Sequence, residues 1–206
     1  GACRVCIVEV EIRGRGKIVT SCVYPVEQDC AVYTNSDTVK EERAMVLALL
    51  KARSPESIRI SKLAEHYGAP SFDRFVTLDG EKCIVCGLCM QACESLGTGA
   101  ISLVLRGTDK KVDTPYSNPS LDCIGCLSCA NVCPVDAIEF TDDGKTRHIW
   151  GCDFELVHCA SCGEVMGTPE MLLKASKETG EEVATLCDAC KKEKIGEDLK
   201  QVYHLI

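Results

Sequence analysis

Two runs of cysteine share the spacing C-x2-C-x2-C-x3-C, and this spacing constrains the chain more than any other feature. The runs occupy residues 83–93 and 123–133. Such a loop offers three thiolates to one iron–sulfur cube, and the fourth cysteine, which begins a helix, ligates the cube of the other run. The sequence therefore predicts two [4Fe–4S] clusters. The predicted ligands are Cys83, Cys86, Cys89 and Cys133 for cluster 1, and Cys93, Cys123, Cys126 and Cys129 for cluster 2.

The overall cysteine content also limits the class of protein. A count of 17 cysteines in 206 residues would suit a secreted disulfide scaffold, but such scaffolds are shorter than about 100 residues and follow a signal peptide. Close C-x2-C pairs without a secretory segment favour metal ligands in a reducing compartment. The longest apolar stretch, residues 44–50, is too short for a membrane span of about 20 residues. We expect a cytoplasmic protein without a membrane span.

The charge balance argues against nucleic acid as a partner. The formal net charge is −8, whereas phosphate binding requires a basic face. Basic residues gather at 191–194, but acidic residues flank them, which is typical of a solvated helix face.

The first 23 residues predict a hairpin that carries three cysteines. Cys3 and Cys6 lead into Ile7–Ile12, which alternates apolar and charged residues as a half-buried strand does. Residues 14–16 predict a turn, and residues 17–23 predict a returning strand that brings Cys22 back towards the first pair. Taken alone, this set could equally be a zinc knuckle.

Two helices are predicted next, and then the doubled motif. The first helix covers 36–53, with a capping box of Thr38 and Glu41, and the second covers about 57–67 and ends at Gly68. They form a spacer without chemistry of their own. The two copies of the cysteine motif align residue for residue, which predicts a pseudo-two-fold βαβ–βαβ unit.

The tail contains a further set of four cysteines. These are Cys159, Cys162, Cys187 and Cys190, two C-x2-C pairs that enclose a helix predicted from Thr168 to Gly180. Two such pairs are typical of a zinc ribbon, in which four thiolates hold one ion. A segment this small needs the metal to fold. Zinc is favoured, and a further [4Fe–4S] cluster remains the alternative.

Other candidate groups receive structural interpretations. Cys30 and Cys152 are expected to be buried thiols, with a role as an additional ligand as the alternative. Glu94 stands where the second copy has Pro134, and we hypothesise that a desolvated carboxylate there lowers the potential of the nearby cluster. No catalytic residues are predicted, because no nucleophile–base pairing and no dinucleotide or phosphate loop can be argued from the sequence.

The first 68 residues resemble a known module. The segments GACRVCIVEV and SCVYPV, followed by a long helix, are similar to the plant-type [2Fe–2S] module of the large iron–sulfur subunit of complex I. The same module opens subunits of NAD(P)-linked hydrogenases and formate dehydrogenases, including bifurcating ones, and the resemblance continues into the two-cluster domain. It implies a [2Fe–2S] centre on Cys3, Cys6 and Cys22, with the fourth ligand and first strands expected upstream of Gly1.

Together these features predict an α+β protein of four modules. They are a partial [2Fe–2S] β-grasp ferredoxin at 1–36, a helical spacer at 37–78, a bacterial-type 2[4Fe–4S] ferredoxin domain at 79–143, and a zinc-ribbon-like tail at 148–206. The resemblance implies an electron-transfer subunit in a hetero-oligomer. It would link a flavin/NAD(P)H-binding subunit to a catalytic subunit or to soluble ferredoxin. A free ferredoxin-like carrier and a redox-sensing metalloprotein are the alternatives.

Overall fold

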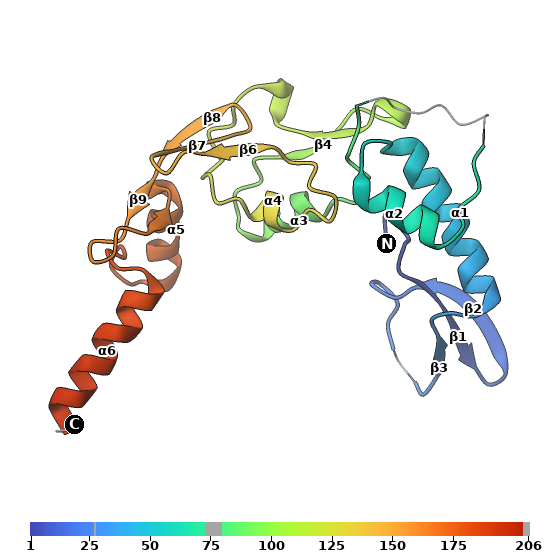
Figure 1. Cartoon of the computed structure of the whole chain (residues 1–206), viewed down its shortest axis with the longest axis horizontal. Helices are drawn as coiled ribbons and strands as arrows, with labels where there is room; N and C mark the ends of the chain where they lie inside the picture. Colours follow the sequence, from blue (N-terminus) through green and yellow to red (C-terminus); the bar gives the residue numbers. More distant parts are fainter. Residues whose placement is uncertain (27, 73–79, 204–206) are drawn as a thin grey trace. The chain divides into compact units, whose positions relative to one another are not determined.

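The computed structural model describes residues 1–26, 28–72 and 80–203, with only the backbone of Gln201 (Figure 1). The chain divides into two compact units. Unit 1 comprises Gly1–Cys89, Leu103–Val112 and Val132–Ile138, and unit 2 comprises Met90–Ser102, Asp113–Asn131 and Glu139–Ile206. Each unit combines helices with small sheets, as the α+β prediction required. No helix among the described residues is long and apolar enough to cross a membrane.

Unit 1 begins with an antiparallel sheet in the order β2-β1-β3. Its strands are β1 (Ile7–Ile12), β2 (Arg15–Thr20) and β3 (Ala31–Tyr33). The predicted hairpin is confirmed, but the turn predicted at 14–16 is wrong. The turn residues are Arg13 and Gly14, with φ of 52° and 76°. Left-handed conformations at both central positions match the twist of a tight hairpin, so β2 begins at Arg15.

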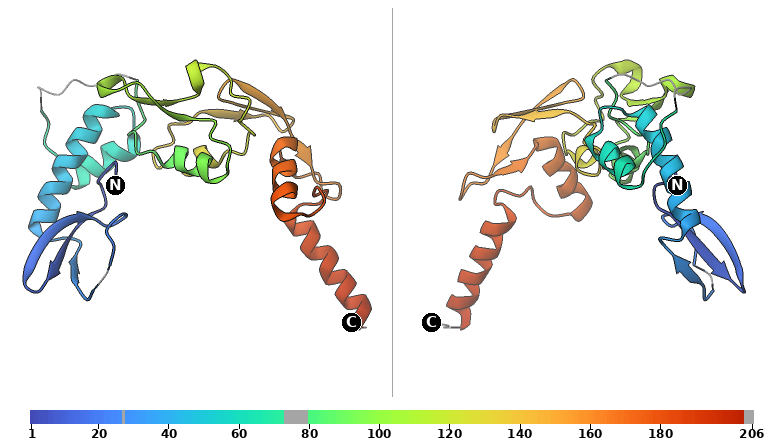
Figure 2. Two further views of the ribbon diagram at one scale, coloured as in Figure 1. Left: turned by 180° about the vertical axis from the view of Figure 1, so that it is seen from behind. Right: turned by 45° about the vertical axis from the view of Figure 1, so that its right-hand side comes forward.

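One helix packs beside this sheet, and a second packs against the first (Figure 2). Helix α1 (Asp37–Arg53) contacts β1, and α2 (Ile58–His66) contacts α1. The capping box predicted at Thr38 is wrong, because Ser36 accepts the hydrogen bond from Val39 N–H at 3.4 Å and caps the helix. Helix α2 is capped by Ser57 and is followed by Gly68 with φ of 60°, as expected.

A buried arginine of α1 organises this module. Arg43 is 7% exposed, and its Nη2 and Nε donate to the carbonyls of Ile7 at 2.6 Å and Val5 at 3.1 Å. Nη1 donates to the carbonyl of Thr34 and the hydroxyl of Tyr67. The charge is therefore compensated by several acceptors, as a buried cation requires. Since Val5 lies between Cys3 and Cys6, Arg43 fixes the backbone that carries both cysteines.

The doubled motif contains less regular structure than predicted. Its helices are α3 (Leu88–Ser95) and α4 (Ser128–Asn131), and β4 (Ser102–Val104) forms a two-stranded sheet with β5 (Lys111–Asp113). The short 3₁₀ turns η1 (Gly107–Asp109) and η2 (Pro115–Ser117) lie in the insert. The strand expected ahead of the first cysteine run falls on residues 73–79, outside the described residues, so the βαβ–βαβ unit stays a prediction; in the second copy, β5 precedes the run and β6 (Phe140–Asp142) follows α4.

The remaining elements of unit 2 form two small sheets and two helices. A sheet in the order β6-β7-β8 contains β6 (Phe140–Asp142), β7 (Thr146–Ile149) and β8 (Cys152–Glu155), and β9 (Val157–His158) pairs with β10 (Val165–Gly167). Helix α5 (Pro169–Thr179) begins after the N-cap Thr168 and ends at Gly180 with φ of 73°, which confirms the predicted bounds. Helix α6 (Asp188–Tyr203) follows.

Replacing Arg43 by methionine should lower the free energy of unfolding by about 3 kcal/mol, because several buried carbonyls lose their charged donor. Lys40→Met on the same helix is the matched control. Within the described part of the chain Lys40 is exposed and pairs with Asp37, so its loss should cost less than about 0.5 kcal/mol. Chemical denaturation followed by circular dichroism measures both. Equal small losses would contradict the organising role of Arg43.

Candidate metal centres

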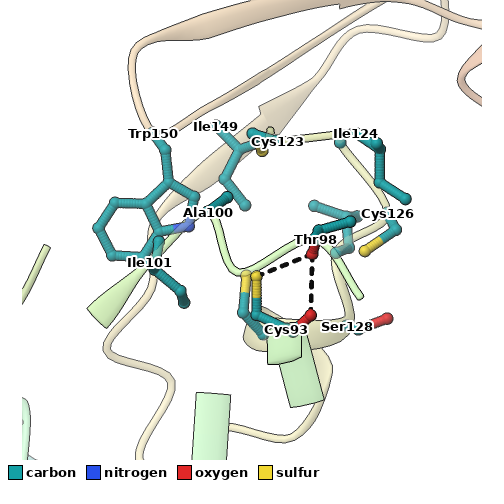
Figure 3. Close-up of a pocket in the computed structure, with 13 residues that line it drawn as sticks. Cys93, Thr98, Ala100, Ile101, Cys123, Ile124, Cys126, Ser128, Ile149 and Trp150 are labelled. Atoms are coloured by element: carbon teal, nitrogen blue, oxygen red, sulfur yellow. Dashed lines mark hydrogen bonds between the residues drawn. The ribbon is translucent and has the colours of Figure 1, made fainter. Parts of the chain in front are cut away.

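Four predicted ligands line one cavity in unit 2. Cys93, Cys123, Cys126 and Cys129 surround a space of about 350 Å³, its open mouth included (Figure 3). Apolar side chains, among them Ile101 and Ile149, supply most of the remaining wall. The structure thus brings Cys93, from the first cysteine run, together with three cysteines of the second run.

The environment of these thiols combines burial with backbone donors. Burial raises the pKa of Cys123 to about 11, although the Gly125 N–H donates to its sulfur. Burial likewise raises the pKa of Cys129. The Cys93 thiol lies 3.1 Å from the Thr98 hydroxyl, which donates to the Cys93 carbonyl at 2.9 Å (Figure 3). Burial therefore favours the protonated form of Cys123 and Cys129 until a metal displaces the proton, and the Gly125 N–H then stabilises thiolate charge.

Unit 1 contains a matching set around a small apolar cluster. Ile60, Ile84 and Val135 form this cluster, and Cys86 and Cys133 pack against it. Burial raises the pKa values of Cys83 and Cys86, and the Cys133 thiolate adds to both shifts. The fourth predicted ligand, Cys89, is buried in the same unit. Backbone N–H groups also reach these sulfurs: Val85 donates to Cys83, and Ala137 donates to Cys133, each at 3.3 Å.

The two cysteine loops share an unusual backbone. Two positions in each copy are left-handed: Val85 and Gly87 in the first, and their counterparts Gly125 and Leu127 in the second. The φ angles are 53°, 80°, 63° and 59° in that order. Alternation of right- and left-handed residues turns successive N–H groups into a concave nest, a geometry that suits anions and iron–sulfur clusters. The cysteines, donors and apolar walls of both sites therefore fit [4Fe–4S] clusters.

Arg147 fixes the backbone of the second cysteine loop. The sequence did not identify this residue. The residue is buried, and its Nη1 donates to the Gly125 carbonyl at 2.9 Å. It also donates twice to Asp142, at 2.8 and 3.1 Å, which holds the pKa of that carboxyl below its usual range. Arg147 thus ties the loop of unit 2 as Arg43 ties the Cys3–Cys6 segment of unit 1.

The N-terminal cysteines meet only in part. Because Ile7 pairs with Thr20, the hairpin brings Cys22 back to Cys6. Contact with Cys22 changes the pKa of Cys6. Burial raises that pKa, but hydrogen bonds from the Cys22 backbone and thiol and from Ser21 outweigh burial and lower it. Cys3 packs against the apolar cluster that also contacts Cys86.

Cys30 lies too far away to complete this set. It precedes Ala31, which pairs with Glu11 near the opposite end of β1 from Cys6. At about 3.4 Å per residue, that strand separates the two cysteines by roughly 15–20 Å. The interpretation of Cys30 as a fourth ligand is therefore wrong.

Two further expectations concern the cluster surroundings. Glu94 is exposed, so the desolvation on which its proposed effect depended is absent. Cys152 is half-buried, with its sulfur 3.7 Å from the Ser120 carbonyl, and it lies close enough to Cys123 to add to the rise of that pKa.

The tail cysteines form the tightest group. The sulfurs of Cys159, Cys162, Cys187 and Cys190 all lie within 4.8 Å of one another. Backbone N–H groups of Cys162 and Cys187 donate to the Cys159 sulfur and lower its pKa to about 6. Ala160 N–H donates to the Thr185 carbonyl at 2.9 Å, which ties the two C-x2-C pairs together. The predicted four-cysteine site is thus present as a preformed cluster of ligands.

Comparison with known proteins agrees with this geometry. Residues 76–140 match the family described as a 4Fe–4S dicluster domain. The chain therefore contains a domain of the class that carries two [4Fe–4S] clusters.

The chain is also similar to subunits of NAD(P)-linked enzymes, as its resemblance implied. It is 31% identical over 163 residues to the NADP-reducing hydrogenase subunit HndD of Solidesulfovibrio fructosivorans, covering 66% of this chain and 28% of that protein. It is 26% identical over 190 residues to a subunit of the NADH-quinone oxidoreductase of Rhizobium meliloti (strain 1021), covering 79% of this chain and 22% of that protein. The chain thus spans less than a third of the length of these relatives.

A solved structure shows the same likeness. A chain of the NAD⁺-reducing [NiFe]-hydrogenase, crystallised in the H₂-reduced state, superimposes with a TM-score of 0.54 and 27% identity. The match covers 66% of this chain and 68% of that chain.

Gly125→Ala should disrupt the second cysteine loop. A Cβ there would lie 2.7 Å from the Phe154 ring and 2.9 Å from the Thr168 methyl. Gly144→Ala is the matched control, because Gly144 has a φ of +82° and nothing within 4 Å of an added Cβ. We expect Gly125→Ala to cost about 1–3 kcal/mol more than the control and to reduce the iron bound by the protein. Thermal unfolding and iron analysis measure these effects; indistinguishable variants would contradict the packing account.

Proposed function

We propose that this chain is an electron-transfer subunit that passes single electrons between the partners of a multisubunit oxidoreductase. The observation that carries the proposal is the cavity lined by four cysteines in unit 2, while the other four cysteines of the two runs lie in unit 1, within a dicluster domain. The similarity to subunits of NAD(P)-linked hydrogenase and NADH-quinone oxidoreductase supports it. The partners on this proposal are a flavin/NAD(P)H-binding subunit and a catalytic redox subunit or soluble ferredoxin, in the cytoplasm.

In this proposal the ligation is crossed, which means that the fourth cysteine of each run binds the cluster of the other run. Cys133 groups with Cys83, Cys86 and Cys89 in unit 1, although it belongs to the second cysteine run. Cys93 of the first run lines the unit 2 cavity with the cysteines of the second run. Both placements support the sets predicted for cluster 1 and cluster 2.

The electron path proposed within unit 1 starts at the [2Fe–2S] ligands. Cys3 packs against the same apolar cluster as Cys86 and Cys133. Its thiolate lies close enough to Cys86 to add to the rise of the Cys86 pKa. A [2Fe–2S] centre held by Cys3, Cys6 and Cys22 would therefore adjoin cluster 1, so that one short step connects them.

The protein groups around each cluster have electrostatic roles rather than acid–base roles. A bound cluster supplies the one-electron chemistry. The N–H groups of Val85 and Gly125 stabilise negative charge on the sulfurs, and the apolar walls exclude water. Arg43 and Arg147 keep the cysteine loops fixed, so that little rearrangement accompanies each electron. No side chain is required as a nucleophile, acid or base.

We propose that the tail site holds Zn²⁺ and supports assembly with a partner subunit. Tetrahedral zinc with Zn–S of about 2.3 Å places its sulfurs about 3.8 Å apart. The upper limit of 4.8 Å and the Cys162–Cys187 distance of 3.6 Å are close to that spacing. A [4Fe–4S] cube needs a larger distance between the cysteine sulfurs, because each sulfur binds a different iron of the cube.

The electron-transfer proposal can be tested with Cys126→Ser in the native complex, isolated through a tag on this chain. We expect cluster 2 to be lost and electron flow from NAD(P)H to the physiological acceptor to fall at least tenfold. Reduction of an artificial dye at the flavin subunit should remain unchanged. Full electron flow in the variant would contradict the proposal, and recovery of the native chain without any partner would favour a free carrier.

Paired substitutions distinguish crossed from uncrossed ligation. Cys83→Ala with Cys133→Ala removes two ligands of cluster 1 if ligation is crossed, so one complete cluster should remain. Cys83→Ala with Cys93→Ala is the matched control and should damage both clusters. Electron paramagnetic resonance of the reduced proteins counts the clusters. The opposite pattern, one cluster in the control and none in the first variant, would establish uncrossed ligation.

A further inference from the structure

Trp150 presents an unused hydrogen-bond donor to the cluster 2 cavity. Its indole lines the cavity with Cys93 and Cys129, and Figure 3 shows the ring nitrogen on the side that faces the cavity. Nε1 is buried and has no hydrogen-bond partner within the described residues. It lies near enough to Cys129 to lower the pKa of that thiol, which burial raises more strongly. A buried donor without a full hydrogen bond is costly and requires an explanation.

The backbone at Trp150 also argues against a role in packing alone. Trp150 and Gly151 form the two-residue turn between β7 and β8, with φ of 52° and 72°. Such turns favour asparagine, aspartate or glycine at the first position, and a bulky aromatic residue there is strained. Strained residues persist where the surrounding structure fixes them, and they gather at functional sites. At Trp150 the strained turn positions the indole N–H on the wall of a cysteine-lined cavity.

We propose that the Trp150 indole N–H donates a hydrogen bond to a sulfur of cluster 2 and raises the reduction potential of that cluster. The inference rests on the proposed function, because it requires cluster 2 to be present. Reduction adds negative charge to the cluster, and a donor to sulfur stabilises the reduced form more than the oxidised form. The indole keeps its proton, so the step is a one-electron reduction without proton transfer. Trp150 is thus a tuning residue that favours arrival of the electron at cluster 2.

The proposal can be tested by removing the N–H without changing the shape of the ring. Trp150 is the one tryptophan among the 206 residues, so expression in a tryptophan auxotroph supplied with β-(3-benzothienyl)alanine replaces its N–H with sulfur at this position. Trp150→Phe is a second variant, and it also lacks the donor. Ile149→Val is the matched control, because Ile149 lines the same cavity and the N–H is retained.

The measurement is a potentiometric titration with dithionite, followed by electron paramagnetic resonance. We expect the equilibrium constant for reduction of cluster 2 to fall about tenfold in both donor-free proteins, a shift of about 59 mV for one electron. The other cluster and Ile149→Val should be unchanged. If the donor-free proteins bind two clusters with unchanged potentials, the tuning role of Trp150 is overturned but the proposed function is not. Failure of the unmodified protein to bind two clusters would overturn the proposed function instead.

Discussion

The structure depends on the need to bring cysteine thiols together in modules with very little core of their own. Burial opposes ionisation of these thiols, as the raised pKa values of Cys83 and Cys123 show, and neighbouring thiolates repel one another. The chain meets this difficulty with backbone N–H groups directed at sulfur, from left-handed positions such as Val85 and Gly125. The small apolar clusters stabilise the fold only in part, and metal binding adds to this stability because ligation energy contributes to folding.

Buried arginines are the second common device. Arg43 in unit 1 and Arg147 in unit 2 come from regular elements, and each donates to carbonyls of a cysteine-bearing loop. Both bind backbone rather than sulfur, so they fix the position of the loops without neutralising thiolates directly. Fixed loops suit one-electron chemistry, in which the ligands need to move little.

The spacing of the cysteines indicated which of them the structure brings together in the unit 2 cavity and in the tail, because that spacing is a local property of the chain. The β1–β2 hairpin and the caps of α5 were also predictable from short segments. The strand expected ahead of the first cysteine run lies at residues 73–79, outside the described residues, so the βαβ repeat stays a prediction there. Arg43, Arg147 and Trp150 were missed because their contacts join distant segments. Arg43 did leave a signal, as a charged residue on the buried face of α1 between Val39 and Leu47.

We propose that separate cysteine sets hold two cubes, one [2Fe–2S] centre and one zinc ion. Metal analysis of the full-length protein, purified without oxygen and examined by Mössbauer spectroscopy, tests it most directly. The account predicts about ten Fe and one Zn per chain, with about eight Fe in cubes. About fourteen Fe without Zn would place a third cube in the tail, and fewer than about eight Fe in cubes would contradict the dicluster assignment.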